Sequence, residues 1–90
     1  MPIARLVNNY FSIHPDDRGP AVILIQRALQ RLGYEVPQDG KFEEATGAAV
    51  RQLQREAQLE ETGVVNVETA NAIDAKIHTL MDEGRDTTQA

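Results

Sequence analysis

The sequence contains no cysteine and no tryptophan, and it has only two tyrosines and two phenylalanines. The absence of cysteine excludes disulfides, thiolate metal sites and thiol catalysis. With so few aromatic residues, a hydrophobic core has to be built from Leu, Ile, Val and Ala. Apolar residues make up 41% of the 90 residues, which is enough for one small folded domain and too many for a disordered chain.

Basic residues and long apolar runs are also scarce. Nine Lys and Arg stand against fourteen Asp and Glu, a net charge of -5, whereas a nucleic-acid binder normally carries a basic stripe. No apolar run approaches the roughly 18 residues of a membrane span. Asn8 and Asn9 interrupt the first residues before the apolar run of a signal peptide could form. We therefore expect no nucleic-acid partner, no membrane span and no signal peptide.

Few residues could carry catalysis or bind a metal ion. His14 and His78 lie far apart, and neither has a neighbour at metal-ligand spacing. Ser12 is the only serine and lacks the flanking glycines of a nucleophile elbow. The carboxylate pairs Glu43-Glu44 and Glu60-Glu61 could suggest a glycosidase, but a helix start and a polar loop explain them better. We expect no catalytic residue, no metal site and no cofactor.

The spacing of apolar residues predicts three helices. The first spans residues 20–32 and ends before Gly33, which can adopt the left-handed conformation that closes a helix. The second spans residues 44–57, and the third follows Asn66, a residue type that caps helix starts. The apolar faces carry Val22, Ile25, Leu29 and Leu32 in the first helix, Ala45, Ala49, Leu53 and Ala57 in the second, and Ala70, Ile73, Ile77 and Leu80 in the third.

The remaining segments are predicted to be less regular. Residues 3–11 could form a short additional helix, because their apolar residues fall on one helical face. The residues around Phe42 and the pair Val64-Val65 could form a short extended pairing with each other. Residues 82–90 contain no apolar residue before the terminal Ala90, and we expect a frayed tail there.

A loop and the helix that follows it occur twice, 23 residues apart and without a gap. The glycines permit the positive φ of a tight turn, and the threonines can satisfy a local backbone group one turn into each helix. The dipeptide Ile25-Gln26 also resembles Leu53-Gln54. Duplication explains this series better than chance does. The matched pairs are Gly40 and Gly63, Phe42 and Val65, Thr46 and Thr69, Ala49 and Ala72, and Val50 and Ile73.

An ordered set of residues between residues 19 and 77 adds a family resemblance. The set is Gly19, Val22, Gln26, Leu29, Gly33-Tyr34, Asp39-Gly40-Lys41-Phe42, Thr46, Ala49-Val50, Gln54, Leu59 and Thr62-Gly63-Val64-Val65. In order and spacing, it resembles the peptidoglycan-binding domain family, whose members are appended to cell-wall hydrolases. The resemblance implies an all-α fold, a compact three-helix bundle with an extra N-terminal helical segment and an internal loop–helix repeat. It divides the chain into an N-terminal extension (1–18), the domain itself (19–80) and a flexible polar tail (81–90).

The chain departs from the family pattern at several positions. Leu53 still suits a core slot and Asn66 still suits a cap, so these changes preserve the fold. The loss of aromatic residues bears more on the ligand, because sugars and peptides often pack on aromatic faces. The departures are Ile25 for leucine, Glu43 for glycine, Leu53 for phenylalanine, Gln58 for glycine, Asn66 for aspartate and Ala70 for tryptophan.

The resemblance implies a non-catalytic module that binds peptidoglycan through its glycan or its stem peptide. Such a module would target a hydrolase, a phage lysin or an exported effector to the polymer. It implies a place in the cell envelope or periplasm, with a cytoplasmic stage before export or release because no signal peptide is seen. The alternative is a protein–protein adaptor that keeps the fold without the polymer. The missing tryptophan, the missing signal peptide and the apolar residues 3–11 favour that alternative, and the ordered match favours wall binding.

We predict a ligand-binding site where the long first loop meets the helices. Tyr34 could offer an aromatic face and a hydroxyl, and Asp39 with Lys41 could offer polar contacts. Arg27 and Arg31, on the outer face of the first helix, could bind carboxylates of a stem peptide. Each residue also has a structural interpretation: Tyr34 as a half-buried residue closing the helix, Asp39 as a turn residue, and the arginines as part of a solvated face.

Overall fold

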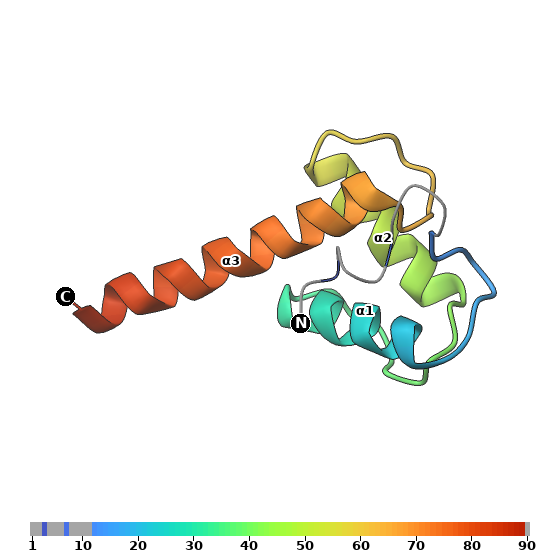
Figure 1. Ribbon diagram of the computed structural model, residues 1–90, viewed down its shortest axis with the longest axis horizontal. Coiled ribbons are helices and arrows are strands. Elements are labelled where there is room, and N and C mark those ends of the chain that lie inside the picture. The colour runs from blue at the N-terminus through green and yellow to red at the C-terminus, as the bar shows by residue number, and fades with distance from the viewer. Residues whose placement is uncertain (1–2, 4–6, 8–11, 90) are drawn as a thin grey trace.

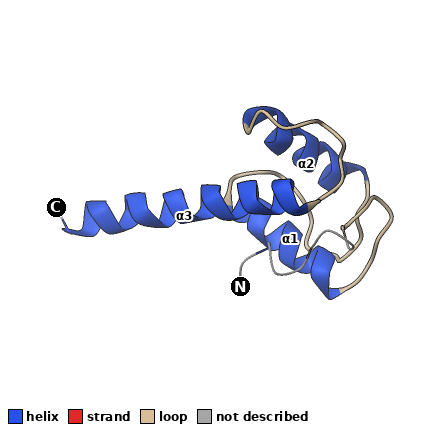
Figure 2. Cartoon of the chain, turned by 45° about the horizontal axis from the view of Figure 1, so that its top comes forward, coloured by secondary structure: helices blue, strands red, loops and turns tan. Residues whose placement is uncertain are grey.

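The computed structural model describes residues 3, 7 and 12–89, and its regular elements are three helices. These are α1 (Pro20–Arg31), α2 (Glu44–Glu56) and α3 (Val67–Gln89) (Figure 1). No strand occurs in the described part of the chain (Figure 2). Helix α3 packs against α1 and α2, and its second half projects away from the body that the three helices form (Figures 1 and 2). The predicted all-α, three-helix fold is confirmed.

Helix α1 begins and ends as its sequence predicts. Pro20 occupies the first turn, where its missing N–H costs no hydrogen bond. At the other end, Gly33 adopts a φ of +96°. The N–H of Gly33 donates to the carbonyl of Gln30, and the N–H of Tyr34 donates to the carbonyl of Leu29, both at 3.0 Å. This pair of bonds is a Schellman motif, which directs the chain out of the helix toward Tyr34.

Helix α2 ends with the same motif, but without glycine. Gln58 adopts a φ of +61°, and its N–H donates to the carbonyl of Arg55 at 3.1 Å. The N–H of Leu59 donates to the carbonyl of Gln54 at 2.7 Å. Gln58 therefore occupies the left-handed position where the family pattern has glycine, and its side chain makes that conformation less favourable.

Helix α3 has the predicted start and a later end than predicted. The Asn66 Oδ1 accepts a hydrogen bond from the N–H of Thr69 at 2.9 Å, which confirms Asn66 as the N-cap. The helix continues to Gln89, and the flexibility expected of the polar tail at residues 81–90 stays a prediction. Polar composition does not stop a helix, and no proline interrupts this stretch. None of the described helices has both the length and the apolar character needed to cross a membrane.

Among the described residues, the core is aliphatic with one aromatic side chain, that of Phe42. It joins most of the predicted faces of the three helices, except that Leu80 is 45% exposed and Ala45 is exposed as well. Ile3 and Val7, from the expected N-terminal helix, are buried; the rest of residues 3–11 lies outside the described residues. The buried apolar residues are Ile3, Val7, Ile13, Val22, Ile25, Ala28, Leu29, Val36, Phe42, Ala49, Val50, Leu53, Val65, Ala70 and Ile73.

An extended segment before α1 crosses both loops of the repeat. Ile13 and Val65 exchange backbone hydrogen bonds of 3.0 and 2.8 Å. Phe42 donates to the carbonyl of Asp17 at 3.0 Å and accepts from the N–H of Asp16 at 2.9 Å. The predicted pairing of Phe42 with Val65 is therefore wrong. The duplicated loops present equivalent backbone edges, and the segment before α1 pairs with both.

Candidate functional site

The buried amide of Gln26, on α1, holds the first loop of the repeat. Its Oε1 accepts a hydrogen bond from the N–H of Gly40 at 2.9 Å. Its Nε2 lies 3.0 Å from the carbonyl of Lys41, 3.0 Å from the Oγ1 of Thr46 and 3.2 Å from Oδ1 of Asp39. One side chain thus fixes the turn and the start of the following helix.

The buried amide of Gln54, on α2, makes the same contacts to the second loop. Its Oε1 accepts from the N–H of Gly63 at 3.0 Å. Its Nε2 donates to the carbonyl of Val64 at 3.0 Å, to Thr69 Oγ1 at 2.9 Å and to Thr62 Oγ1 at 3.2 Å. The duplication therefore extends to the hydrogen bonds, and Gly40 and Gly63 share a φ of +75°.

These contacts correct one expectation and limit where a ligand can bind. The Thr46 and Thr69 hydroxyls accept from glutamine side chains and do not satisfy only a local backbone group. No buried side-chain nitrogen or oxygen among the described residues lacks a hydrogen-bond partner. The buried polar groups are therefore occupied by the fold, and a ligand has to use the surface.

Asp39 serves the turn that Gln26 holds. Its Oδ1 accepts from the N–H of Lys41 at 3.0 Å as well as from Gln26. These hydrogen bonds, the one from the Lys41 backbone first, lower the pKa of Asp39 below its usual value. The structural interpretation of Asp39 is thus supported. The Lys41 side chain is exposed, and neither residue lines the grooves described next.

A first groove, of about 580 Å³, lies between the end of α1 and one face of α2. On the α2 side its wall is made of alanines, whose small side chains leave the space open. The polar groups come from the loop after α1 and from the second half of α2. The lining residues are Leu32, Gly33, Tyr34, Glu35, Ala45, Ala48, Ala49, Gln52 and Glu56.

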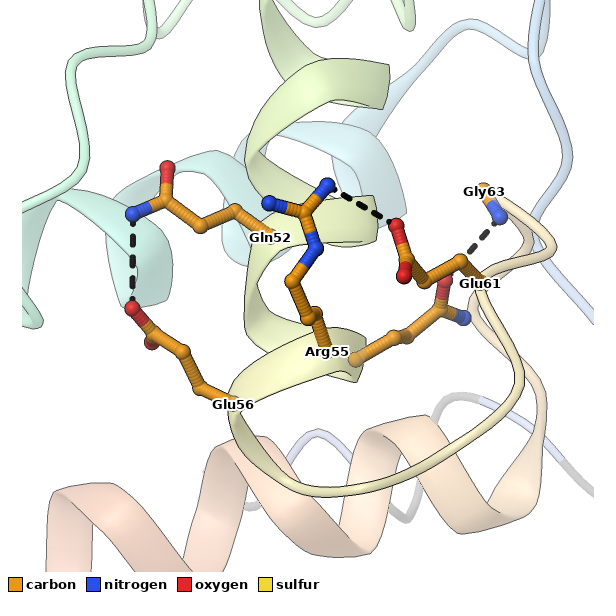
Figure 3. A network of polar contacts seen from close by, with 6 residues as sticks. Gln52, Arg55, Glu56, Glu61 and Gly63 are labelled. Atoms are coloured by element: carbon orange, nitrogen blue, oxygen red, sulfur yellow. Dashed lines mark hydrogen bonds and ion pairs between the residues drawn. The ribbon is translucent and has the colours of Figure 1, made fainter.

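Tyr34 and Glu56 join the two walls of this groove. The Tyr34 hydroxyl donates a hydrogen bond to the Glu56 carboxylate. Gln52 Nε2 donates to the same carboxylate at 3.3 Å, and Lys76 Nζ lies 3.7 Å from Glu56 Oε1. Figure 3 shows Gln52 and Glu56 on one side of α2, while Arg55 reaches the other way to Glu61 at 3.0 Å. The cluster ties the chain after α1 to α2 and α3.

The same contacts set the protonation of the pair. Burial first, and then the Glu56 carboxylate, raise the pKa of the Tyr34 hydroxyl far above its usual value. The hydrogen bond from Tyr34 first, then the one from Gln52, lower the pKa of Glu56. At neutral pH the pair is therefore a neutral phenol donating to an ionised carboxylate. Tyr34 is half-buried, in agreement with its structural interpretation, and it also lines this groove.

A second groove, of about 400 Å³, lies on the other side of the Tyr34–Glu56 pair, against α3. It shares Leu32, Tyr34 and Glu56 with the first groove. Gln52, Glu56 and α3 were not predicted to contribute to the site. The i, i+4 spacing of Gln52 and Glu56 indicates only that they share a helix face. The second groove is lined by Leu32, Tyr34, Glu56, Ala75, Lys76, Thr79 and Leu80.

The other two predicted residues lie elsewhere. Arg27 and Arg31 line a smaller hollow of about 160 Å³, whose other residues include Leu24 and Ile77. The five predicted residues thus fall in three places: Tyr34 in the grooves, Asp39 and Lys41 on the first loop, and the arginines between α1 and α3. The described residues contain no group of three or more His, Asp or Glu side chains that could hold a metal ion.

Comparison with known families gives one match. Residues 18–73 match the model of a family described as a peptidoglycan binding domain. The matched range contains α1, α2, both loops of the repeat and the start of α3. Comparison with curated proteins gives no match.

Solved structures similar to this chain include three with a TM-score of 0.69. A peptidoglycan-binding protein from Clostridioides difficile, in complex with glutamine hydroxamate, is 28% identical over 71% of this chain and 40% of its own. The SleB N-terminal domain is 28% identical over 78% of this chain and 97% of its own. An L,D-transpeptidase from Xylanimonas cellulosilytica is 36% identical over 72% of this chain. The present chain spans only 32% of that transpeptidase structure.

Proposed function

Because this chain belongs to the peptidoglycan-binding domain family, we propose that it is a non-catalytic module that holds the wall polymer in its first groove. The observation that carries the proposal is the open, mostly polar groove between the end of α1 and α2, inside the range that matches the family. Gln26 and Gln54 hold the loops before and after α2. The Schellman turn fixes the direction of the chain after α1. Both elements that form the groove are therefore held in place.

The groups in the groove suit a ligand rich in hydroxyls and amides. Gln52 can donate and accept through its carboxamide, and Glu35 and Glu56 can accept from sugar hydroxyls or peptide N–H groups. Tyr34 adds a partly exposed aromatic ring, on which a sugar ring can pack. Alanines at positions 45 and 48 are exposed and leave the backbone of α2 accessible. These features support binding of a polar polymer and need no cofactor.

The protonation of Glu56 supports a binding role over a catalytic one. A general acid in glycoside hydrolysis needs a raised pKa, so that it holds a proton at working pH. Here hydrogen bonds from Tyr34 and Gln52 lower the pKa of Glu56. The carboxylate therefore stays ionised and serves as an acceptor.

The module would act beside an enzyme of the cell envelope. In the Clostridioides difficile and Xylanimonas cellulosilytica structures, the similar region is only part of a longer chain. By holding the polymer, the module would raise the local concentration of substrate for a hydrolase or another fused or associated enzyme. We place this action at the cell wall, in the envelope or periplasm.

A pull-down with insoluble peptidoglycan sacculi tests the proposal. We expect saturable binding by the wild type, weakened about fivefold by Gln52→Ala through loss of one hydrogen bond. The matched control is Arg55→Ala, which changes an exposed residue of the same helix that reaches Glu61 and lines neither groove, and it should bind as the wild type does. Wild-type binding no stronger than that of an acidic helical protein of equal size would refute the function. Loss of binding only in Arg27→Ala or Asp39→Ala would move the site to those residues.

A further inference from the structure

The second groove differs in chemistry from the first. Its walls include three aliphatic side chains, Leu32, Ala75 and Leu80. Among described residues 3, 7 and 12–80, Leu80 is the one large apolar side chain that is exposed. The groove also contains the ammonium group of Lys76, whereas the first groove has no basic lining residue. An aliphatic wall beside a single cation suits a ligand that ends in small apolar groups and a carboxylate.

The Lys76 ammonium is placed to bind a second carboxylate. Its Nζ lies 3.7 Å from Glu56 Oε1. A charge-assisted hydrogen bond is typically about 2.7–2.9 Å long, so this ion pair is looser than such a bond. Glu56 already accepts hydrogen bonds from Tyr34 and Gln52, and these bonds occupy part of its capacity to accept. An ammonium carries three donors, so Lys76 can be oriented by Glu56 and still donate to a ligand.

The two grooves are adjacent. Leu32, Tyr34 and Glu56 line both, so a polymer in the first groove has the second groove directly beyond the Tyr34–Glu56 pair. The far wall of the second groove is formed by Ala75, Lys76, Thr79 and Leu80 of α3. This part of α3 lies outside residues 18–73, which match the family.

We propose that the second groove binds the carboxyl-terminal end of the wall's stem peptide, with Lys76 donating to the terminal carboxylate and Leu32, Ala75 and Leu80 contacting alanine methyl groups. This inference rests on the proposed function, since it assumes that the polymer occupies the first groove. It assigns Ala75, Lys76, Thr79 and Leu80 of α3 to the binding site and gives the module a preference for uncrosslinked stems, which keep a free carboxylate.

Calorimetric titration of the whole chain with two synthetic stem pentapeptides tests this. One ends in D-alanine with a free carboxylate, and the other carries a carboxamide there. We expect the free acid to bind about tenfold more tightly, the value of one charge-assisted hydrogen bond. Lys76→Met, which keeps the aliphatic stem, should reduce that ratio to about one. Lys41→Met removes a lysine outside both grooves and should leave the ratio unchanged, and Leu80→Ser should weaken both peptides equally.

The possible outcomes separate this inference from the proposed function. If the wild type binds the free-acid peptide and the carboxamide peptide equally well, the inference is overturned, and no variant is needed to interpret that result. A ratio that survives Lys76→Met in a variant folded by circular dichroism also overturns it. Sacculi binding without binding of either pentapeptide leaves the proposed function standing and overturns only the stem-peptide site. If sacculi do not bind either, both fail.

Discussion

Gln26 and Gln54 lie on different helices and make the same four hydrogen bonds, each to the loop ahead of the next helix. Helix α2 therefore belongs to both units of the repeat. It begins after the loop that Gln26 holds, and its own Gln54 holds the loop that precedes α3. The glutamines are 28 positions apart, whereas the loops are 23 apart, because Gln26 lies three residues further from the end of its helix than Gln54 does and the first connection is two residues longer. That longer connection, residues 32–43, supplies Tyr34 and Glu35 to the first groove.

Replacing either glutamine by alanine should destabilise the domain strongly. Gln54→Ala removes the side-chain partner of the Gly63 N–H and of the Thr69 hydroxyl, and Gln26→Ala does the same to the Gly40 N–H and the Thr46 hydroxyl. We expect a loss of about 2–4 kcal/mol for each, because buried polar groups lose their hydrogen bonds. Urea unfolding measures it. Gln52→Ala, at an exposed glutamine, should stay within about 0.5 kcal/mol of the wild type. A similarly small effect at Gln54 would contradict the structural role of the repeat.

Restoring the family's glycine should stabilise the end of α2. Gln58 has a φ of +61°, and a left-handed conformation costs a non-glycine residue roughly 1 kcal/mol. Gln58→Gly should therefore raise the free energy of unfolding by about 0.5–1 kcal/mol, reduced somewhat by the added flexibility of the unfolded chain. The reverse change at the equivalent turn, Gly33→Ala, should lower it by a similar amount. A destabilised Gln58→Gly would mean that the side chain makes a contact worth more than the strain.

The Tyr34–Glu56 pair should make stability depend on acidic pH. The folded-state pKa of Glu56 is lowered, so its contribution is complete above the carboxyl's ordinary pKa and is lost as pH falls through the lowered value. Denaturant unfolding across acidic pH should show the wild type losing more stability than Glu56→Gln. Tyr34→Phe removes the hydrogen bond that contributes most to the lowered pKa of Glu56. This variant should therefore lose as little stability at acidic pH as Glu56→Gln does. Parallel pH profiles for all three proteins would show that the pair has no energetic role.

Removing residues 1–18 should destabilise the domain, although the family resemblance places its start at residue 19. Ile3, Val7 and Ile13 are buried, and the backbone of Ile13 pairs with Val65. Loss of these apolar side chains alone should cost about 3 kcal/mol or more. Thermal unfolding compares this truncation with removal of residues 84–90, at the projecting end of α3, which should leave the melting temperature nearly unchanged. A fully stable 19–90 fragment would show that the extension is dispensable.

The sequence predicts the helices well, because their signals are local. Pro20, Gly33 and Asn66 mark helix ends through backbone geometry that depends on a few neighbouring residues. The repeat also identified Gln26 and Gln54 as equivalent. Their hydrogen-bonding role was missed, because the residues that each amide contacts become neighbours only after the helices pack.

The site was harder to predict for the same reason. Tyr34 was found because it is an aromatic residue in a sequence with few of them. Gln52, Glu56 and Lys76 resemble ordinary exposed polar residues, and only packing brings them to Tyr34. Arg27 and Arg31 were predicted from charge alone and lie in a different hollow. The comparisons support wall binding and give no support to the adaptor alternative.

The most direct test of the account is nuclear magnetic resonance mapping of the whole chain with soluble, uncrosslinked peptidoglycan fragments. Binding in the first groove should shift the backbone amides of Gly33 and Glu35 and the side-chain amide of Gln52, with smaller changes at Arg55. The buried side-chain amides of Gln26 and Gln54 should stay in place, because the loops they hold do not move. Shifts confined to Arg27 and Arg31, or to the loop around Asp39, would contradict the assignment of the groove. The absence of any shift at saturating fragment would contradict wall binding itself.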